Sequence, residues 1–457
     1  MSINGKPFAI IGAGLAGLTA ANYLKRNAVP FVLFEAGPKI AGLASSFKDD
    51  EGFSYDFGAH FVTNRLAAAI GVSADCRVVH HYSETVWLKG KSYGYPFGLM
   101  SMPRFSFSAM VSRLKRKTET ETAADYFRGE YGNALADEVA LPLLEAWSGA
   151  PANELSASVG NKLANSIVKT LWLKLAGKIS RRAIACGYSH EMPESANVWH
   201  VYPNGGISTL CKKLADGLDA NIKLESPVES IVIEDNRAAK VRVKGEEIEV
   251  AGVISTAPIN ILAKLVKGTD ALKSLHAFRY RPMVFVNLRF EGRGLLPDVV
   301  TWTPEKHFPF FRLTEATLSM PWLAPEGKTL ITADIGCEVG DEIWTKSDDE
   351  LGELCLRGLE KIIPNAREKY KGCRVLKTPI AYPVYLAEYE AKREEIEKSL
   401  GIEGLISIGR NGEFAHILME DVYWRTLKRM RLFVRENQFP TQIENAKSIA
   451  ISSSICI

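Results

Sequence analysis

Three glycines and one glutamate near the N-terminus have the types and spacing of a dinucleotide-binding site. Gly12, Gly14 and Gly17 directly follow the apolar run 8–11, and Glu35 stands 18 positions after Gly17. Gly12 permits a tight turn, Gly14 lets a pyrophosphate approach the backbone at a helix N-terminus, and Gly17 allows close packing of helix on strand. Glu35 would accept hydrogen bonds from ribose hydroxyls and repel a 2′-phosphate, so the pattern predicts FAD or NAD rather than NADP.

The elements that must position these residues form one βαβ unit. Residues 8–11 and 30–34 have the apolar character of buried parallel strands, and between them Leu15, Leu18, Ala21 and Leu24 recur at helical spacing. The neighbours of the turn and of the glutamate belong to the same predicted cofactor site, namely Leu15, Ala16 and Ala36. In this strand–turn–helix context the glycine motif is a strong signal.

The rest of the chain predicts a nucleotide domain that is interrupted twice. Residues 66–199 are mostly helical in pattern, with a hairpin-like stretch at 86–97. Strand-like alternation returns up to residue 258, and residues 405–414 again read as a strand entering a glycine turn. We predict an α/β fold with a discontinuous Rossmann-like FAD/NAD(P)-binding domain and an α+β substrate-binding domain. The first comprises 1–65, 200–275 and 402–436, the second 66–199 and 276–401, and 437–457 form a tail.

Composition and charge exclude several classes of protein. The 457 residues are 46% hydrophobic with a net charge of +3, which gives no global field to attract nucleic acid. The seven cysteines are scattered without a CxxC pair, so we expect neither a metal site nor a disulfide framework. No apolar run reaches about 18 residues, and the start lacks the pattern of a signal peptide. We therefore expect a cytoplasmic protein with a small-molecule substrate.

Two segments beyond Glu35 carry a resemblance to a known superfamily. IAGLASSFKDDEGFSYDFGAHFV, residues 40–62, resembles the second flavin motif of the amine oxidase, protoporphyrinogen oxidase and UDP-galactopyranose mutase flavoproteins, and GRNGEFAHILMED, residues 409–421, resembles the closing flavin segment of the mutases. The resemblance implies FAD as the cofactor, with adenine held at Val228, and no motif suggests covalent attachment. The further cofactor-binding residues that it implies are Gly42, Leu43, Gly58, Ala59, His60, Gly409, Arg410, Glu413 and Met419.

Two kinds of flavin chemistry are consistent with this resemblance. The first is an oxidoreductase of the protoporphyrinogen oxidase, amine oxidase and desaturase-like group, in which an unidentified small molecule loses hydride to flavin N5. The second is a mutase, in which reduced flavin attacks a nucleotide sugar and Arg312 holds the diphosphate. The sequence favours the first, because Glu145 and Thr317 stand where the mutases have basic residues. A flavin-binding protein without catalysis is a third interpretation, motivated by Ala41, Leu43 and Glu145.

The candidate catalytic residues have structural alternatives. His60, Arg312 and Tyr382 are the candidates, but Arg312 could equally close a salt bridge, and Tyr382, like Trp147, is more often a core aromatic. Residues 161–182 form a basic, helix-like region with an apolar stripe. Such a stripe usually faces a core, so contact with a membrane surface is the less favoured interpretation. The basic cluster at 113–117 is interpreted as a solvated face, and the sequence leaves the oligomeric state open.

Overall fold

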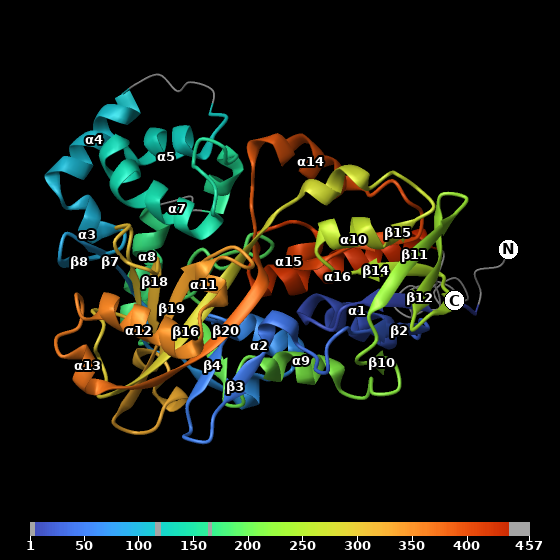
Figure 1. Ribbon diagram of the computed structural model, residues 1–457, viewed down its shortest axis with the longest axis horizontal. Helices are drawn as coiled ribbons and strands as arrows, with labels where there is room; N and C mark the ends of the chain where they lie inside the picture. The colour runs from blue at the N-terminus through green and yellow to red at the C-terminus, as the bar shows by residue number, and fades with distance from the viewer. Residues whose placement is uncertain (1–4, 115–119, 163–166, 438–457) are drawn as a thin grey trace, which may run out of the picture.

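A computed structural model describes residues 5–114, 120–162 and 167–437 (Figure 1). The predicted tail, apart from Asn437, lies outside these ranges, as do the last three residues of the basic cluster 113–117. The protein has a mixed α/β fold, as expected at the level of fold class.

The first sheet has five parallel strands, in the order β10 (Ile222–Lys223), β2 (Phe31–Phe34), β1 (Phe8–Ile11), β14 (Gly252–Ser255) and β21 (Leu405–Ser407). The first and second predicted strands are thus confirmed, and their register pairs Phe8 with Phe31. Helix α1 (Leu15–Arg26) contacts both α9 (Ser208–Ala215) and the long α16 (Met419–Glu436). Because both faces of β1 are buried, its four residues are all apolar.

The second sheet is mixed and has seven strands, and it crosses the other end of the molecule (Figure 1). Their order is β20 (Tyr370–Pro383), β16 (Tyr280–Glu291), β19 (Lys328–Gly336), β18 (Arg312–Glu315), β17 (Val300–Trp302), β7 (Glu84–Leu88) and β8 (Lys91–Gly94). The predicted hairpin at 86–97 corresponds to β7 and β8. Helix α12 (Asp348–Leu359) packs on β16 and β20, and its N-terminus carries a capping box of Ser347 and Glu350.

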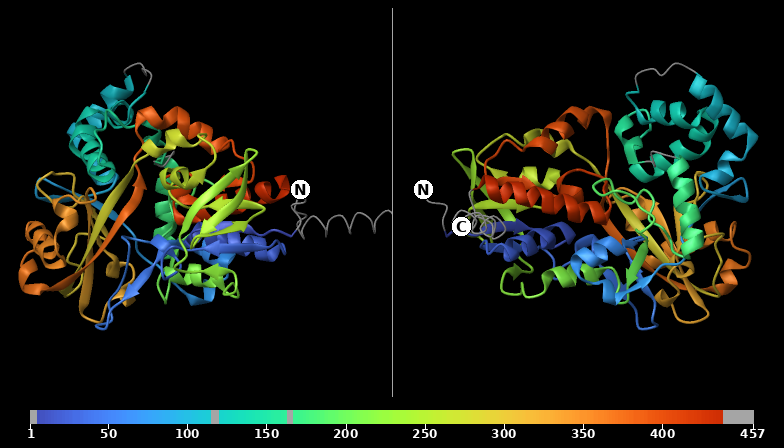
Figure 2. Two further views of the ribbon diagram at one scale, coloured as in Figure 1. Left: turned by 45° about the vertical axis from the view of Figure 1, so that its right-hand side comes forward. Right: turned by 180° about the vertical axis from the view of Figure 1, so that it is seen from behind.

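A helical lobe stands beside the β7–β8 edge of this sheet, at the upper left of Figure 1. It contains α3 (Phe97–Met100), α4 (Pro103–Leu114), α5 (Ala123–Tyr131), α6 (Asn133–Leu135), α7 (Leu141–Ser148) and α8 (Ile167–Ser180). Views from the side and from behind show the same lobe projecting away from the five-stranded sheet (Figure 2).

Smaller elements connect these parts. A four-stranded sheet has the strands β13 (Glu246–Glu249), β12 (Arg237–Val243), β11 (Val228–Glu234) and β15 (Val266–Lys267). It contacts the first sheet through β12 and β14. Two small sheets join β3 (Ser46–Lys48) to β4 (Ser54–Asp56), and β5 (Val62–Thr63) and β6 (Cys76–Val78) to β9 (His200–Pro203). The remaining α-helices are α2 (Asn64–Ile70), α10 (Ile259–Leu265), α11 (Glu342–Thr345), α13 (Ala366–Lys369), α14 (Glu390–Lys398) and α15 (Gly409–Gly412).

Candidate functional site

The glycine turn and Glu35 lie together at the carboxyl ends of β1 and β2. Ala13 N donates to Glu35 Oε2 at 2.7 Å, and Gly37 N donates to Oε1 at 2.8 Å. A Cβ on Gly17 would lie 1.9 Å from the carbonyl oxygen of Gly12, so only glycine lets α1 approach this closely. A Cβ on Gly14, in contrast, would meet nothing within 4 Å. The backbone at Gly14 therefore faces open space, as a site for pyrophosphate requires.

Two further glycine turns close on the first. Ala41 N donates to Ala13 O at 2.8 Å, and a Cβ on Gly42 would lie 3.7 Å from the Cα of Gly14. Gly409 has φ +81°, and a Cβ there would come within 2.7 Å of the Ala16 side chain. Three turns that are far apart in sequence thus meet around one helix N-terminus, where backbone N–H groups favour an anion.

The segment that leads to Val228 is fixed to the same end of the sheet. Ser226 N donates to Glu35 O at 2.8 Å, and Glu225 N donates to Gly37 O at 3.0 Å. Val228 begins β11 and is buried. Ala36 is exposed at the rim. The open turn at Gly14, the fixed carboxylate of Glu35 and the adjacent backbone of Val228 together fit an extended dinucleotide.

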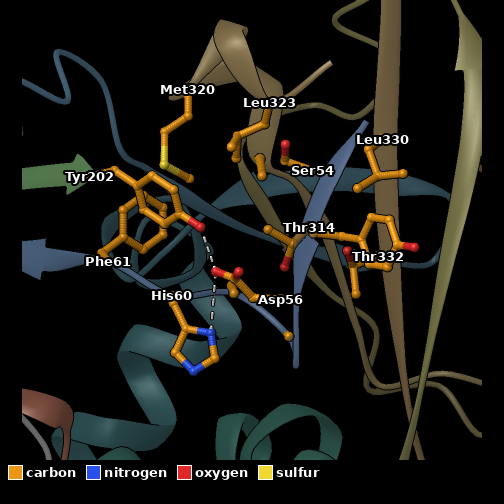
Figure 3. A pocket seen from close by; sticks show the side chains of 14 residues that line it. Ser54, Asp56, His60, Phe61, Tyr202, Thr314, Met320, Leu323, Leu330 and Thr332 are labelled. Carbon is orange, nitrogen blue, oxygen red and sulfur yellow. Dashed lines mark hydrogen bonds and ion pairs between the residues drawn. The ribbon is translucent and has the colours of Figure 1, made fainter. Parts of the chain in front are cut away.

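Asp56 organises the segment that carries His60. Its Oδ2 accepts from Tyr202 Oη at 2.6 Å and lies 3.6 Å from His60 Nδ1 (Figure 3). Its Oδ1 accepts from Ser46 Oγ at 2.6 Å. Burial, followed by the charge of Asp56, raises the pKa of Tyr202 well above its ordinary value, so the phenol stays a donor. Beside Asp56 is a cavity of about 20 Å³, lined largely by Met320, Leu323 and other apolar or hydroxyl side chains. This cavity has room for one water molecule but not for a substrate.

Arg312 reaches the His60 segment but is occupied by an ion pair. A Cβ on Gly58 would lie 3.5 Å from Arg312 Nη2, which places the two segments in contact. Arg312 Nε donates to Asp334 Oδ2 at 2.9 Å and Nη2 donates to the same oxygen, while the Asp334 side chain is fully buried. Although burial alone lowers the pKa of Arg312, the Asp334 carboxylate raises it above its ordinary value, so the guanidinium stays charged. The salt-bridge alternative for Arg312 is the one present.

Arg410 stands in an aromatic group with Tyr382. Its guanidinium lies 4.7 Å from the centre of the Tyr382 ring, and Tyr382 packs 5.1 Å from Trp147, which stacks on His416 at 4.7 Å. Burial lowers the pKa of Arg410. In the described part of the chain, its Nε and Nη2 are buried and have no hydrogen-bond partner. Two buried, unsatisfied donor nitrogens on a guanidinium fit an acceptor that the protein itself does not supply.

Glu413, predicted to contact the cofactor, fixes the closing turn. Its Oε1 accepts from Gly409 N at 3.0 Å, and its Oε2 lies 2.7 Å from Arg425 and 3.1 Å from Arg429. Both carboxylate oxygens are therefore engaged by protein groups. Met419 opens α16, and the adjacent buried Glu420 pairs with Arg65 at 2.6 Å. A contact of Glu413 or Met419 with the cofactor stays a prediction.

Sequence reasoning missed three residues of this region, which are Asp334, His416 and Tyr202. Asp334 had a readable signal, because it is a lone carboxylate in the apolar strand LITADIG and such a charge needs a buried partner. His416 lies within the closing flavin segment, between Phe414 and Met419. Tyr202 gives no signal of its own, since its role depends on the position of Asp56 in a different strand.

The described residues contain neither a candidate membrane-spanning helix nor a candidate metal site. None of their helices has both the length and the apolar character needed to cross a bilayer. Within the same ranges, no group of three or more His, Cys, Asp or Glu side chains is placed to hold a metal ion.

Comparison with known proteins identifies the family. The model of the flavin-containing amine oxidoreductase family matches residues 15–387. The chain is 22% identical to coproporphyrinogen III oxidase of Bacillus subtilis (strain 168), over 88% of this chain and 92% of that protein. It is also 22% identical to the chloroplastic/mitochondrial protoporphyrinogen oxidase 2 of Arabidopsis thaliana, over 87% and 88%. These matches confirm the superfamily inferred from the two flavin motifs.

Solved structures share the fold. Reduced UDP-galactopyranose mutase superposes with a TM-score of 0.76 at 19% identity, over 93% of this chain and 94% of that one. Putrescine oxidase bound to putrescine gives a TM-score of 0.65 at 16% identity, over 94% and 99%. At these identities the likeness describes the fold alone. Because the family model covers most of the sequence, the chain belongs to the flavin-containing amine oxidoreductases and is an FAD-dependent oxidoreductase.

Proposed function

We propose that this enzyme oxidises a small organic molecule beside an FAD held non-covalently by the three glycine turns. When bound, FAD supplies the acceptor for a hydride from the substrate. In this proposal Glu35 holds the ribose, Gly14 and Gly42 line the pyrophosphate and Val228 contacts the adenine. Arg410 then offers N–H groups of its two unpartnered nitrogens, Nε and Nη2, to an acceptor on the cofactor.

The proposed division of the chain follows the same geometry. Residues 1–65, 200–275 and 402–436 would form a Rossmann-like FAD-binding domain, and 66–199 with 276–401 a substrate-binding domain. The five parallel strands that surround the glycine turns all come from the first three segments, which supports this division.

The substrate pocket is proposed at the aromatic group of Trp147, Tyr382 and His416. The centres of these rings lie within 5.2 Å of one another, next to the half-buried Arg410. Their part would be to orient a flat or apolar substrate and to exclude water while hydride leaves it. His60 and Gly58 would face the cofactor from the opposite segment.

One observation carries the oxidoreductase proposal over the mutase. Arg312, the residue that would hold a nucleotide sugar's diphosphate, already donates two hydrogen bonds to the buried Asp334. A diphosphate would have to compete for Arg312 with the Asp334 carboxylate, which is inaccessible to water. The site therefore suits a substrate that has no diphosphate for the Arg312 guanidinium to bind.

The test is anaerobic flavin absorbance of the purified protein. Candidate porphyrinogens, such as those named for the two relatives, and candidate amines are added to oxidised enzyme. Bleaching of the flavin by one of them, at a rate that matches turnover, supports the proposal. If none bleaches it and UDP-galactopyranose is converted only by enzyme reduced beforehand with dithionite, the oxidoreductase proposal is wrong.

A mutase-like reaction is the second candidate. What favours it is the fold, since reduced UDP-galactopyranose mutase superposes with a TM-score of 0.76 over 93% of the chain. It would require Arg312 to leave Asp334 when the nucleotide sugar binds. Binding of UDP to the enzyme, measured by calorimetry, would support this candidate, and no detectable binding at millimolar UDP would count against it.

A further inference from the structure

Two arginines reach the candidate site, and only one of them is paired with a carboxylate. Arg312 donates to the buried Asp334 through Nε and Nη2. No carboxylate of the described residues forms an ion pair with Arg410, whose Nε and Nη2 are buried and have no hydrogen-bond partner. The positive charge of Arg410 is therefore the uncompensated one of the two.

The acidic residue nearest to Arg410 in the sequence is held by other cations. Glu413 Oε1 accepts from Gly409 N at 3.0 Å, and its Oε2 lies 2.7 Å from Arg425 and 3.1 Å from Arg429. Because two arginines already share this carboxylate oxygen, Glu413 is not available to neutralise Arg410. The closing turn thus presents a guanidinium to the site without an anion of its own.

The other groups around Arg410 do not neutralise it either. Its guanidinium lies 4.7 Å from the ring centre of Tyr382, and Tyr385 is the next tyrosine along the same segment. Both are phenols, and a phenol carries no charge near neutral pH. Burial lowers the pKa of Arg410 and the charge of Arg312 acts in the same direction, but arginine is not deprotonated in proteins. A poorly solvated cation without a counterion favours an anion beside it.

The reaction proposed above creates such an anion. A hydride carries two electrons and one proton to flavin N5, so the reduced ring has one negative charge on its pyrimidine part unless it also takes a proton at N1. A fixed cation in contact with that part stabilises the reduced ring more than the neutral oxidised ring. Such a contact raises the reduction potential of the flavin.

We propose that Arg410 raises the reduction potential of the bound FAD by stabilising the negative charge that the flavin gains on reduction. The inference rests on the proposed function, in which Arg410 donates to an acceptor on the cofactor. Arg312 does not share this part, because Asp334 already neutralises its charge. Tyr382, packed 5.1 Å from Trp147, holds the Arg410 guanidinium in place.

The test is the two-electron midpoint potential of the FAD-loaded full chain, which needs no substrate. Under anaerobic conditions, the enzyme and a dye of known potential are reduced together in small steps, and their absorbances give the oxidised and reduced fractions of each. Arg410→Met should weaken the binding of reduced FAD at least about tenfold more than that of oxidised FAD, because a charged donor is lost. For a two-electron couple this factor lowers the potential by at least about 30 mV.

Two further variants at the same position separate the charge of Arg410 from its size. Arg410→Lys keeps the charge and should retain most of the potential. Arg410→Gln is a second neutral variant, polar and smaller, and should show the same fall as Arg410→Met.

Arg281→Met is the matched control at a neighbouring position. Arg281 pairs in register with Tyr382, and its Nε is also buried without a hydrogen-bond partner. Its charge is compensated, however, since Glu338 lies 2.7 Å from its Nη1. Removing this arginine should change the relative affinity for reduced and oxidised FAD less than about threefold.

Three results would overturn the proposal. They are an unchanged potential in Arg410→Met and Arg410→Gln, an equal fall in Arg281→Met, and a fall in Arg410→Lys as large as in Arg410→Met. All potentials are measured at protein and FAD concentrations that keep the weaker variants loaded. The proposed function fails in a different way, since a flavin that no candidate substrate bleaches still gives a potential against the dye.

Discussion

The buried pair of Arg312 and Asp334 gives the sharpest test of the site. Asp334→Asn removes the negative charge and leaves the Arg312 guanidinium beside a neutral amide. The Asp334 side chain is fully buried and that of Arg312 is 17% exposed, so water screens neither charge effectively. Breaking one half of a buried pair costs about 3–5 kcal/mol. We expect a loss of stability in this range.

The corresponding change in melting temperature follows from the size of the chain. An unfolding entropy of about 2.1 cal/mol/K per residue gives roughly 1 kcal/mol/K for the 457 residues, if they unfold cooperatively. A loss of about 3–5 kcal/mol then lowers the Tm by about 3–5 °C. Differential scanning calorimetry of the FAD-loaded protein measures this shift.

Two control variants distinguish the effect of an unpaired buried charge on stability from a general effect of mutation. Arg312→Met with Asp334→Leu removes both charges and should recover most of the lost stability, because no uncompensated charge remains. Glu249→Gln breaks an exposed pair with Lys6 and should leave the Tm almost unchanged. If Asp334→Asn melts at the unmodified temperature, our assignment of this pair as a buried ion pair is refuted.

Three further predictions concern the cofactor and pH. Gly14→Val should fold normally but lose FAD, because the valine side chain enters the open space at the turn. The ratio of flavin absorbance to protein absorbance measures this loss. Gly129→Val, which also places a side chain in open space, is the control. Arg410→Met should weaken FAD about tenfold to a hundredfold by fluorescence titration, from the loss of charged donors, without destabilising the apoprotein. Burial lowers the pKa of His200 to about 3, so the unfolded chain binds a proton below about pH 6.5 that the folded chain excludes, and stability falls as pH falls. Between pH 7 and 5 this loss is about 2 kcal/mol, and His200→Gln should remove it in urea titrations; equal pH dependence in both proteins would contradict the assignment.

The parts of the structure that sequence predicted are those that local rules determine. The spacing of Gly12, Gly14 and Gly17 after an apolar strand required a turn into a helix, and Glu35 followed at the end of the next strand. Each of these inferences depends on residues within one βαβ unit, where backbone sterics leave few alternatives.

The parts that sequence did not predict depend on contacts between distant segments. Arg312 and Asp334 lie on the neighbouring strands β18 and β19, and nothing in either strand alone specifies the pairing. Helix α8 has apolar residues on two sides, with Leu173 buried and Trp172 exposed. A helical period shows that a stripe exists, but only the packed structure decides which stripe meets the core.

The meeting of Gly409 with Ala16 also bears on how the molecule assembles. The glycine turn that leads into α1 and the turn after β21 are separated by nearly the whole chain. The contact between them therefore has a very high contact order. β21 is also the edge strand of the parallel sheet, paired only with β14 in that sheet. If Gly409 lines the cofactor as we propose, capture of FAD during synthesis waits until β21, the last described strand, has joined the sheet. In that case the cofactor stabilises a fold that is already formed, by mass action, and is not the nucleus around which the chain folds.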